Sequence, residues 1–311
     1  MSDRETTARR FAAQTLGAEP ESWGAPFTVL ASPAWRGIEG DIWRAGAAGK
    51  QVIVKHYQPD TAFYAPPAAA IEAARHAGQL GIAPKVLAAE AAEGLVAFEA
   101  LSEDWRCGGL QDVAVADLRE AVIAAKKAFQ AGPDLSRSTS VFDEIDRLAA
   151  TAAQGGIAVH RHLPALLALM AAAKQAIAAL GSDSRPSHRD GNTANLMVGP
   201  GNNVKLLDYD LAANCDPYED LGCWLMEFFD CEAEARGGFE AWEGRFDEGL
   251  FQRAMIYGMA DDLRWGLIGA LMARRSPRRS LEFAKYASWR LMRLETLALT
   301  SHAADRLRSL S

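Results

Sequence analysis

Residues 188–210 hold the side chains of this sequence that are best suited to chemistry. They read HRDGNTANLMVGPGNNVKLLDYD, in which Asp190 follows a His-Arg pair and Asn195 comes five residues later. In a catalytic loop with this spacing, the carboxylate accepts the proton of a substrate hydroxyl and the carboxamide holds a metal ion. The pattern therefore predicts phosphoryl transfer. The alternative is an ordinary loop whose asparagines only form turns.

The residues after Asn195 predict a β-hairpin, because two short apolar runs flank the turn-forming sequence GPGNN. A hairpin folded symmetrically about Gly201 and Asn202 would place Asn195 opposite Asp208. The Cα atoms of such opposed residues lie about 4.5–5.5 Å apart. We therefore expect Asn195 and Asp208 to hold one Mg2+ ion, which prefers oxygen ligands.

Length and composition narrow the class of protein. A chain of 311 residues exceeds the usual size of one hydrophobic core, so two domains are expected. The net charge of −7 argues against a nucleic-acid partner. No uninterrupted apolar run reaches the roughly 18–20 residues of a membrane span. The four cysteines fit neither a zinc motif nor a disulfide framework, and the first residues lack a secretory signal, so a cytoplasmic protein is expected.

The elements that must position these residues change in character along the chain. Up to about residue 100, short strands surround one Ala-rich helix, and long helices follow from about residue 110. Strands are expected at 27–30, 42–45, 51–55, 84–87 and 95–99. Helices are expected at 68–80, 114–130, 141–153, 164–180, 217–230, 250–273 and 281–298. This order predicts an α+β fold with a nucleotide-binding lobe at 1–100 and a helical catalytic and substrate lobe at 101–311.

Two charged residues of the first lobe precede the catalytic segment in the order found in kinases. Lys55 ends a predicted strand and Glu72 lies on the next helix, where the two could form the ion pair that orients nucleotide phosphates. Alone, each would be read as an ordinary solvated charge. The loop RGIEGD at 36–41 has two glycines but no P-loop pattern, so it either approaches phosphate or forms a hairpin turn.

Together these residues resemble the aminoglycoside phosphotransferase and choline kinase superfamily, over a range from about Trp35 to Arg293. The resemblance implies a two-lobed protein-kinase-like fold, with a small antiparallel β-sheet lobe and a large helical lobe. It also implies ATP and Mg2+ as cofactors. Asp190 would be the catalytic base, and Asn195 and Asp208 would be the metal ligands, Asp208 being the principal one. The nucleotide-binding positions would be Gly37, Lys55, Glu72 and the backbone of Glu99 and Leu101. Gly40 departs from the family pattern, in which Asn is usual.

The C-terminal part resembles the choline and ethanolamine kinase branch of that superfamily. The segments DPYEDLG at 216–222, RWGL at 264–267 and FAKYA at 283–287 are similar to those that surround choline in this branch. A cation over an aromatic face gains about 0.5–2 kcal/mol, and nearby carboxylates add attraction. Ile268 stands where the branch often has a second Trp, and Trp224 fits a buried helix stripe. The candidate substrate residues are Asp210, Glu219, Glu227, Trp265 and Tyr286.

Three functions are compatible with these patterns. The first is a kinase that transfers the γ-phosphoryl group of ATP to a hydroxyl of a small cationic amino alcohol such as choline or ethanolamine. The second keeps this chemistry but changes the acceptor to an aminoglycoside, a sugar or another hydroxylated metabolite. The third is a nucleotide-binding protein without turnover, which would not need Asp190, Asn195 and Asp208. The patterns leave the oligomeric state open.

Overall fold

The computed structural model describes residues 2–26, 38–300 and 303–310. By packing, the chain forms two compact units. Unit 1 contains Met1–Ser136 and Thr193–Ala212, and unit 2 contains Arg137–Asn192 and Ala213–Ser311. This grouping differs from the predicted lobes at 1–100 and 101–311, which remain a prediction. The predicted α+β fold class is confirmed, since unit 1 carries an antiparallel sheet and unit 2 is mostly helical.

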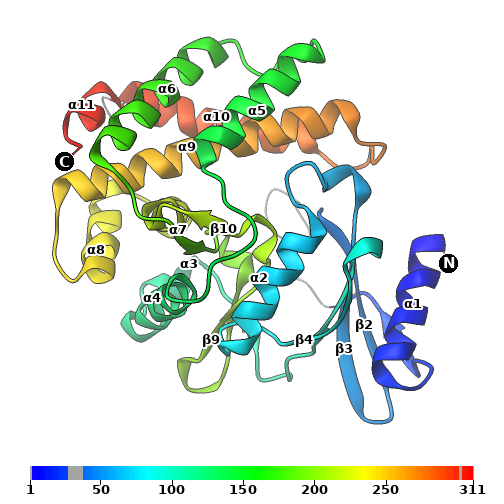
Figure 1. The fold of residues 1–311 in the computed structure, drawn as a ribbon. Helices are drawn as coiled ribbons and strands as arrows, with labels where there is room; N and C mark the ends of the chain where they lie inside the picture. Colours follow the sequence, from blue (N-terminus) through cyan, green and yellow to red (C-terminus); the bar gives the residue numbers. More distant parts are fainter. Residues whose placement is uncertain (1, 27–37, 301–302, 311) are drawn as a thin grey trace. The chain divides into compact units, whose positions relative to one another are not determined.

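Unit 1 is built on a five-stranded antiparallel sheet with the strand order β1-β2-β3-β5-β4. The strands are β1 (Ser22–Gly24), β2 (Gly40–Ala47), β3 (Lys50–Tyr57), β4 (Val86–Glu90) and β5 (Leu95–Glu99). Helix α1 (Asp3–Leu16) covers one face of this sheet (Figure 1). Helix α2 (Pro67–Gln79) packs on side chains of the other face.

Alternation along β3 decides which residues face which helix. Val52 and Val54 belong to the cluster with α1, whereas Tyr57 packs with Ile71 of α2. Because side chains alternate along a strand, Lys55 points to the same face as Tyr57. The strand therefore directs the predicted phosphate-binding lysine to the α2 side of the sheet.

The segment after Asn195 forms the predicted hairpin in unit 1, but its register differs by one residue. β8 (Leu196–Val198) pairs with β9 (Val204–Leu206), and Leu196 lies opposite Leu206. Asn195 therefore lies opposite Leu207, whose N–H donates to the Asn195 carbonyl at 2.7 Å. The expected pairing of Asn195 with Asp208 is wrong. The physical reason is that the loop has five residues, 199–203, so the hairpin is centred on one residue, Gly201, rather than between two.

The rest of unit 1 consists of short elements and one longer helix. β6 (Arg106–Cys107) pairs with β8, and α3 (Leu110–Val113) leads into α4 (Ala116–Gln130). The 3-10 turn η5 (Tyr209–Leu211) follows β9 and contacts α2. This turn places the second half of the predicted catalytic segment beside the helix that carries Glu72.

Unit 2 is a group of helices around one long helix. They are α5 (Val141–Gln154), α6 (Leu163–Leu180), α7 (Pro217–Phe228), α8 (Glu232–Glu243), α9 (Glu248–Arg275), α10 (Phe283–Thr300) and α11 (Ala303–Arg308). Helix α9 contacts α5, α6, α7, α10 and α11 (Figure 1). Its crossing with α7 is close, because a Cβ on Gly222 would lie 2.2 Å from the Ala254 carbonyl oxygen. A two-stranded antiparallel sheet of β7 (Arg185–Ser187) and β10 (Ala213–Cys215) completes the unit.

Most predicted elements are confirmed. All seven predicted helices are present, and the expected strands at 42–45, 51–55 and 95–99 lie within β2, β3 and β5. The strand expected at 84–87 begins two residues later, and the one expected at 27–30 lies outside the described residues. Helices α1, α3, α8 and α11 were not expected.

One helix bears on the expectation that the chain has no membrane span. Within the described part of the chain, α6 alone has the length and composition that could cross a membrane. A single helix of this kind is weak evidence and does not show a membrane span.

Candidate active site

Lys55 lies in a buried group of charges in unit 1. Its side chain is 8% exposed, and Nζ donates to Asp208 Oδ1 at 2.8 Å and to Asp210 Oδ2 at 2.6 Å. Burial alone would lower the pKa of Lys55, but the charges of Asp208 and Asp210 raise this pKa well above its ordinary value. The lysine is therefore a permanent cation at neutral pH.

The two aspartates reach Lys55 because of the turn that follows β9. Asp208 adopts a left-handed backbone conformation with φ 64° and ψ 65°, and the turn η5 begins at the next residue. Left-handed backbone is uncommon outside glycine, although Asp tolerates it better than most residues. Tyr209 packs on Phe129 of α4, with ring centroids 4.9 Å apart, while the aspartates on either side contact Lys55.

Tyr57 adds a neutral donor to this group. Its hydroxyl donates to Asp210 Oδ1 at 2.8 Å, and Lys55 Nζ lies 4.7 Å from the centroid of its ring. One oxygen of Asp210 therefore accepts from Tyr57 and the other accepts from Lys55. Asp210 was expected to contact the substrate, but in unit 1 its two oxygens bind these donors.

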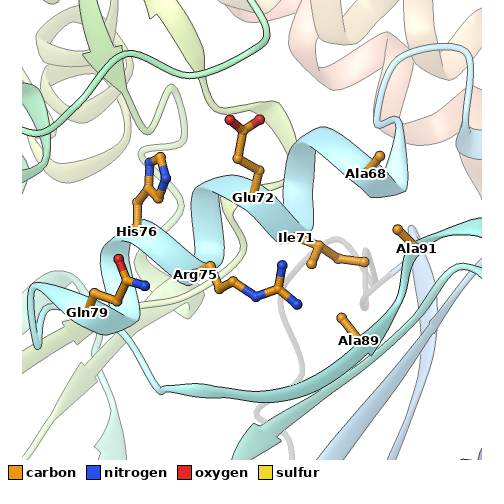
Figure 2. A pocket seen from close by; sticks show the side chains of 8 residues that line it. All are labelled: Ala68, Ile71, Glu72, Arg75, His76, Gln79, Ala89 and Ala91. Carbon is orange, nitrogen blue, oxygen red and sulfur yellow. The ribbon is translucent and has the colours of Figure 1, made fainter.

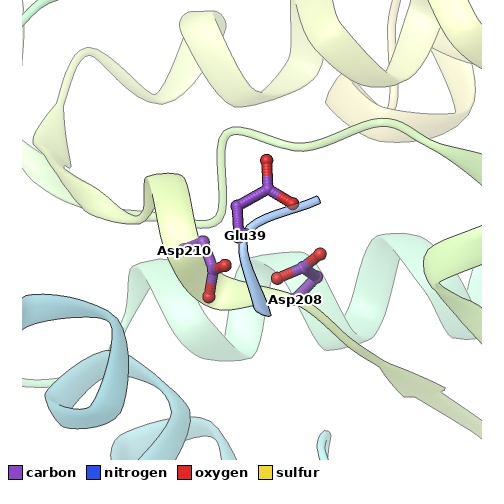
Figure 3. Close-up of side chains that lie close together, drawn as sticks. All are labelled: Glu39, Asp208 and Asp210. Carbon is purple, nitrogen blue, oxygen red and sulfur yellow. The ribbon is translucent and has the colours of Figure 1, made fainter. Parts of the chain in front are cut away.

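Glu39 is a third carboxyl group of the same cluster, from the loop before β2. The ligand atoms of Glu39, Asp208 and Asp210 lie within 4.8 Å of one another (Figure 3). Glu39 also accepts a hydrogen bond from the Tyr64 hydroxyl at 2.9 Å. Burial, then the charges of Asp208 and Asp210, raise the pKa of Glu39 to about 8. Burial, then Asp208, raises the pKa of Asp210 to about 7.

This cluster fits a divalent cation. Carboxylate oxygens are the ligands that Mg2+ prefers, and the raised pKa values show that further positive charge would be favourable here. Asp208 was the expected principal ligand. Asn195, the other expected ligand, ends the 3-10 turn η3 (Thr193–Asn195) just before β8. It lies opposite Leu207, the residue before Asp208.

Glu72 does not form the expected ion pair with Lys55. Its carboxylate instead accepts hydrogen bonds from the Ser136 backbone N–H, at 3.0 Å, and from the Ser136 hydroxyl. The physical reason is that two other carboxylates contact the Lys55 ammonium. Glu72 and Arg75 line a cavity of about 290 Å³ that lies between α2 and the segment carrying Ala89 (Figure 2).

The expected adenine-binding positions follow the end of β5. The Glu99 N–H donates to the Lys85 carbonyl at 2.9 Å, and the Glu99 side chain accepts from the Lys85 N–H at 3.0 Å. The Leu101 carbonyl accepts from Arg44 Nη2 at 3.2 Å. The Glu99 N–H and the Leu101 carbonyl are therefore already hydrogen-bonded within the protein. Gly37, another expected nucleotide-binding residue, lies outside the described residues.

In unit 2, the residue before Asp190 is anchored by buried ion pairs. The Arg189 side chain is fully buried and contacts Glu144 at 2.7 Å and Glu219 at 2.5 Å. Its backbone N–H donates to Asp220 Oδ1 at 2.9 Å. The second Glu219 oxygen accepts from the Val141 N–H at 3.1 Å. Glu219, expected to contact substrate, therefore anchors the residue before Asp190 in this structure.

The loop at Asp190 also depends on a glycine. Asp190 Oδ1 accepts from the Asn192 N–H at 2.7 Å, which closes a tight turn around Gly191. A Cβ on Gly191 would lie 2.1 Å from the Cys223 carbonyl oxygen in α7. The loop that carries Asp190 thus packs directly against helix backbone, and only glycine fits at this position.

Three of the expected substrate residues come together elsewhere in unit 2. Trp265 and Tyr286 make an edge-to-face contact with ring centroids 5.9 Å apart. The Arg290 guanidinium lies 5.2 Å from the Tyr286 ring centroid and 2.5 Å from Glu227. Burial alone would raise the pKa of Glu227, but Arg290 and Arg293 lower it. Tyr286 and Glu227 therefore already contact a cation of the protein itself.

With this geometry established, sequence comparison identifies the family. A model of the phosphotransferase enzyme family matches residues 31–255, which is more than half of the chain. The chain belongs to this family. The predicted class of enzyme, an ATP-dependent phosphotransferase acting on a small molecule, is confirmed. No curated protein matches the sequence of this phosphotransferase.

Solved structures similar to this phosphotransferase confirm its protein-kinase-like fold. A choline/ethanolamine kinase family protein from Mesorhizobium loti has a TM-score of 0.77 at 20% identity, and 96% of this chain and 98% of that chain are covered. Choline kinase LicA from Streptococcus pneumoniae has a TM-score of 0.76 at 17% identity, covering 99% and 100%. A GDP and kanamycin complex of APH(2")-IIia has a TM-score of 0.64 at 14% identity, covering 93% and 96%.

Sequence reasoning missed several residues that shape the site of this phosphotransferase. Tyr57 could have been found, because it lies two residues after Lys55 on a strand and therefore on the same face. Glu39 stands in the glycine-containing loop, where its acidic side chain gave no sign of turning inward. Glu144 lies on the buried side of an amphipathic helix, and a charged residue at such a position usually has a partner.

Proposed function

We propose that this phosphotransferase transfers the γ-phosphoryl group of ATP to the hydroxyl of a small amino alcohol such as choline or ethanolamine. The observation that carries the phosphoryl-transfer assignment is the buried contact of Lys55 with Asp208 and Asp210, with Glu39 beside them. A cation among carboxylates at these motif positions is the arrangement that a metal–nucleotide complex needs.

In this proposal each residue acts through its charge or its position. Lys55 would contact nucleotide phosphate oxygens, and Asp190 would accept the proton of the acceptor hydroxyl. Asp208 and Asn195 would hold Mg2+, with Glu39 and Asp210 beside them. When bound, Mg2+ neutralises charge on the phosphate oxygens. The backbone after β5, from Glu99 to Leu101, would bind the adenine, and the Gly37 loop would approach the phosphates.

The amino-alcohol assignment depends on Glu227, Trp265 and Tyr286. An ammonium beside two aromatic rings and a carboxylate gains cation–π and Coulomb attraction. Because Arg290 and Arg293 already pair with Glu227, a substrate ammonium would have to displace one of these guanidinium groups to reach the carboxylate. We also propose a cytoplasmic protein whose substrate is a small hydroxylated cation.

A substrate panel with ADP release as readout tests the proposal. Choline and ethanolamine should release ADP with Mg2+ present, whereas aminoglycosides and simple sugars should not. Asp190→Asn should lower kcat by about 10²–10⁴-fold, the usual contribution of a general base. The matched control is Asp146→Asn, because Asp146 is 64% exposed and pairs with Lys174 on the surface.

Other outcomes of the panel decide between the alternatives. Turnover of an aminoglycoside or a sugar, without turnover of any amino alcohol, would replace the acceptor but keep the chemistry. Binding of Mg2+ and nucleotide without any phosphorylated product would instead support the silent nucleotide-binding protein. If Asp190→Asn matched Asp146→Asn in kcat on an active substrate, the base assignment would be wrong.

A further inference from the structure

We infer that Tyr57 and Asp210 form a positioning pair for Lys55, in the role that Glu72 was expected to fill. The inference rests on the proposed function, in which Lys55 contacts nucleotide phosphates. It concerns how the lysine is held, and it assigns Asp210 to the lysine rather than to the acceptor.

The first support is the way in which Asp210 is bound. The carboxylate accepts from Lys55 Nζ at 2.6 Å with one oxygen and from the Tyr57 hydroxyl at 2.8 Å with the other. Two donors on different oxygens fix the rotation of the carboxylate plane. Both donors come from the same face of β3, so the strand presents Lys55 and Tyr57 to Asp210 as one rigid unit.

The second support is the difference between the two aspartates. The Asp208 side chain is 24% exposed, whereas that of Asp210 is 6% exposed. Asp208 is thus the more accessible carboxylate for a metal ion and its phosphate ligands. A metal ion bound to Asp208 would neutralise part of its negative charge, so Asp208 would attract Lys55 less strongly. Asp210 remains in contact with the lysine and keeps it near the phosphates.

The third support is that Glu72 has other partners. Its carboxylate accepts from both the backbone and the hydroxyl of Ser136, so moving it to Lys55 would break these hydrogen bonds. The positioning role therefore passes from helix α2 to a turn that directly follows the proposed metal ligand in sequence. Lys55 is then held by Asp210, which lies two positions after the proposed metal ligand Asp208.

Nucleotide binding by variants tests this inference. Tyr57→Phe keeps the ring and removes only the hydroxyl, and Asp210→Asn keeps the shape and removes the charge. Loss of a hydrogen bond to a charged group is typically a tenfold effect or larger. We expect about a tenfold higher Kd for a non-hydrolysable ATP analogue with Mg2+, measured by calorimetry on the full chain. The matched control is Tyr257→Phe, which removes a buried tyrosine hydroxyl that donates to an aspartate, Asp216, in unit 2.

A double-mutant cycle separates positioning from a merely structural role. In the Lys55→Met background, Tyr57→Phe and Asp210→Asn should add less than about twofold to the Kd, because the group that they position is gone. Full additivity in that background would overturn the inference, as would coupling of Glu72→Gln, but not of Asp210→Asn, to Lys55→Met. Melting curves confirm that each variant is folded. If Tyr57→Phe is not, Asp210→Asn gives the same decision.

The same data show which of the two proposals fails. Additivity combined with loss of turnover in Lys55→Met overturns the positioning pair and leaves the kinase assignment intact. Lys55→Met that binds and turns over like the unchanged protein would remove the phosphate-binding role of Lys55, and the proposed function and the inference would fall together.

Discussion

Replacing Glu144 by glutamine should destabilise unit 2 strongly, although the side chain keeps its shape. Glu144 Oε1 accepts from Arg137 at 2.6 Å, and Oε2 accepts from Arg189 at 2.7 Å and Arg264 at 3.1 Å. In either amide orientation, the NH2 group of glutamine would face guanidinium donors. The substitution therefore removes one charge and places donor against donor in a buried site.

The magnitude follows from burial and charge balance. The carboxylates Glu144, Glu219 and Asp261 face the guanidinium groups of Arg137, Arg189 and Arg264, so removing one carboxylate leaves an unbalanced buried cation. Removing one partner of a buried pair costs about 3–5 kcal/mol. In a chain of this size, such a loss lowers Tm by on the order of 10 °C.

Urea unfolding at two pH values is the assay, with Glu248→Gln as the matched control. Glu248 contacts Arg236 at 2.6 Å but is 49% exposed, so its loss should cost less than about 1 kcal/mol. Burial alone would raise the pKa of Glu144, but its arginine partners hold it well below its ordinary value. The stability that depends on this depressed pKa is complete above the unfolded pKa, near 4.5, and is lost as the pH falls.

The difference between Glu144→Gln and the unchanged protein should therefore be large at pH 7 and smaller at pH 4. A loss at pH 7 no larger than that of Glu248→Gln would refute the reasoning. An equal loss at both pH values would show that the cost comes from packing and not from charge.

Two further perturbations follow from the site. Gly191→Ala should lower stability by about 1–3 kcal/mol or more in thermal melts, because its Cβ would meet the Cys223 carbonyl oxygen, whereas Gly237→Ala, with open space around its Cβ, should be neutral or slightly stabilising. Mg2+ should raise Tm more at pH 8.5 than at pH 6. The pKa values of Glu39 and Asp210 are raised to about 8 and about 7. Their contribution to stability is therefore complete below about pH 4 and is lost as the pH rises through these values. At the higher pH, Mg2+ also competes with fewer protons for these carboxylates. Glu39→Gln should weaken this pH dependence, and a Tm shift by Mg2+ that is equal at both pH values would contradict it.

The elements that position the site could be predicted because local patterns determine them. The apolar runs on either side of GPGNN predict the hairpin, and the β-branched run Val52-Ile53-Val54 predicts the strand that carries Lys55. Apolar content and helical periodicity predict the long helices, although α9 is buried on nearly all sides and not on one face. Helix α1 was missed because its sequence, DRETTARRFAAQTL, is mostly polar and only four of its residues are buried.

The partners of the charged residues could not be predicted in the same way. The sequence offers three possible carboxylate partners for Lys55, those of Glu72, Asp208 and Asp210. Which of them contact the lysine depends on how α2 and η5 pack. The hairpin register depended on whether its loop has an odd or an even number of residues, which the turn-forming composition alone does not decide. An error of one residue in the register, or of one ion-pair partner, changes which oxygen atoms lie close together.

Two of the buried charge clusters, around Glu144 and around Lys55, differ in a way that separates structure from function. The cluster around Glu144 balances three carboxylates against three guanidinium groups, as expected of a network that only holds helices together. In the described contacts around Lys55, one ammonium contacts Asp208 and Asp210, and the carboxyl group of Glu39 lies within 4.8 Å of both aspartates. An unbalanced buried cluster costs free energy, because charges without a partner are held away from water. A divalent cation would remove the imbalance, and for that reason we assign the metal and nucleotide to this cluster and a structural role to the other.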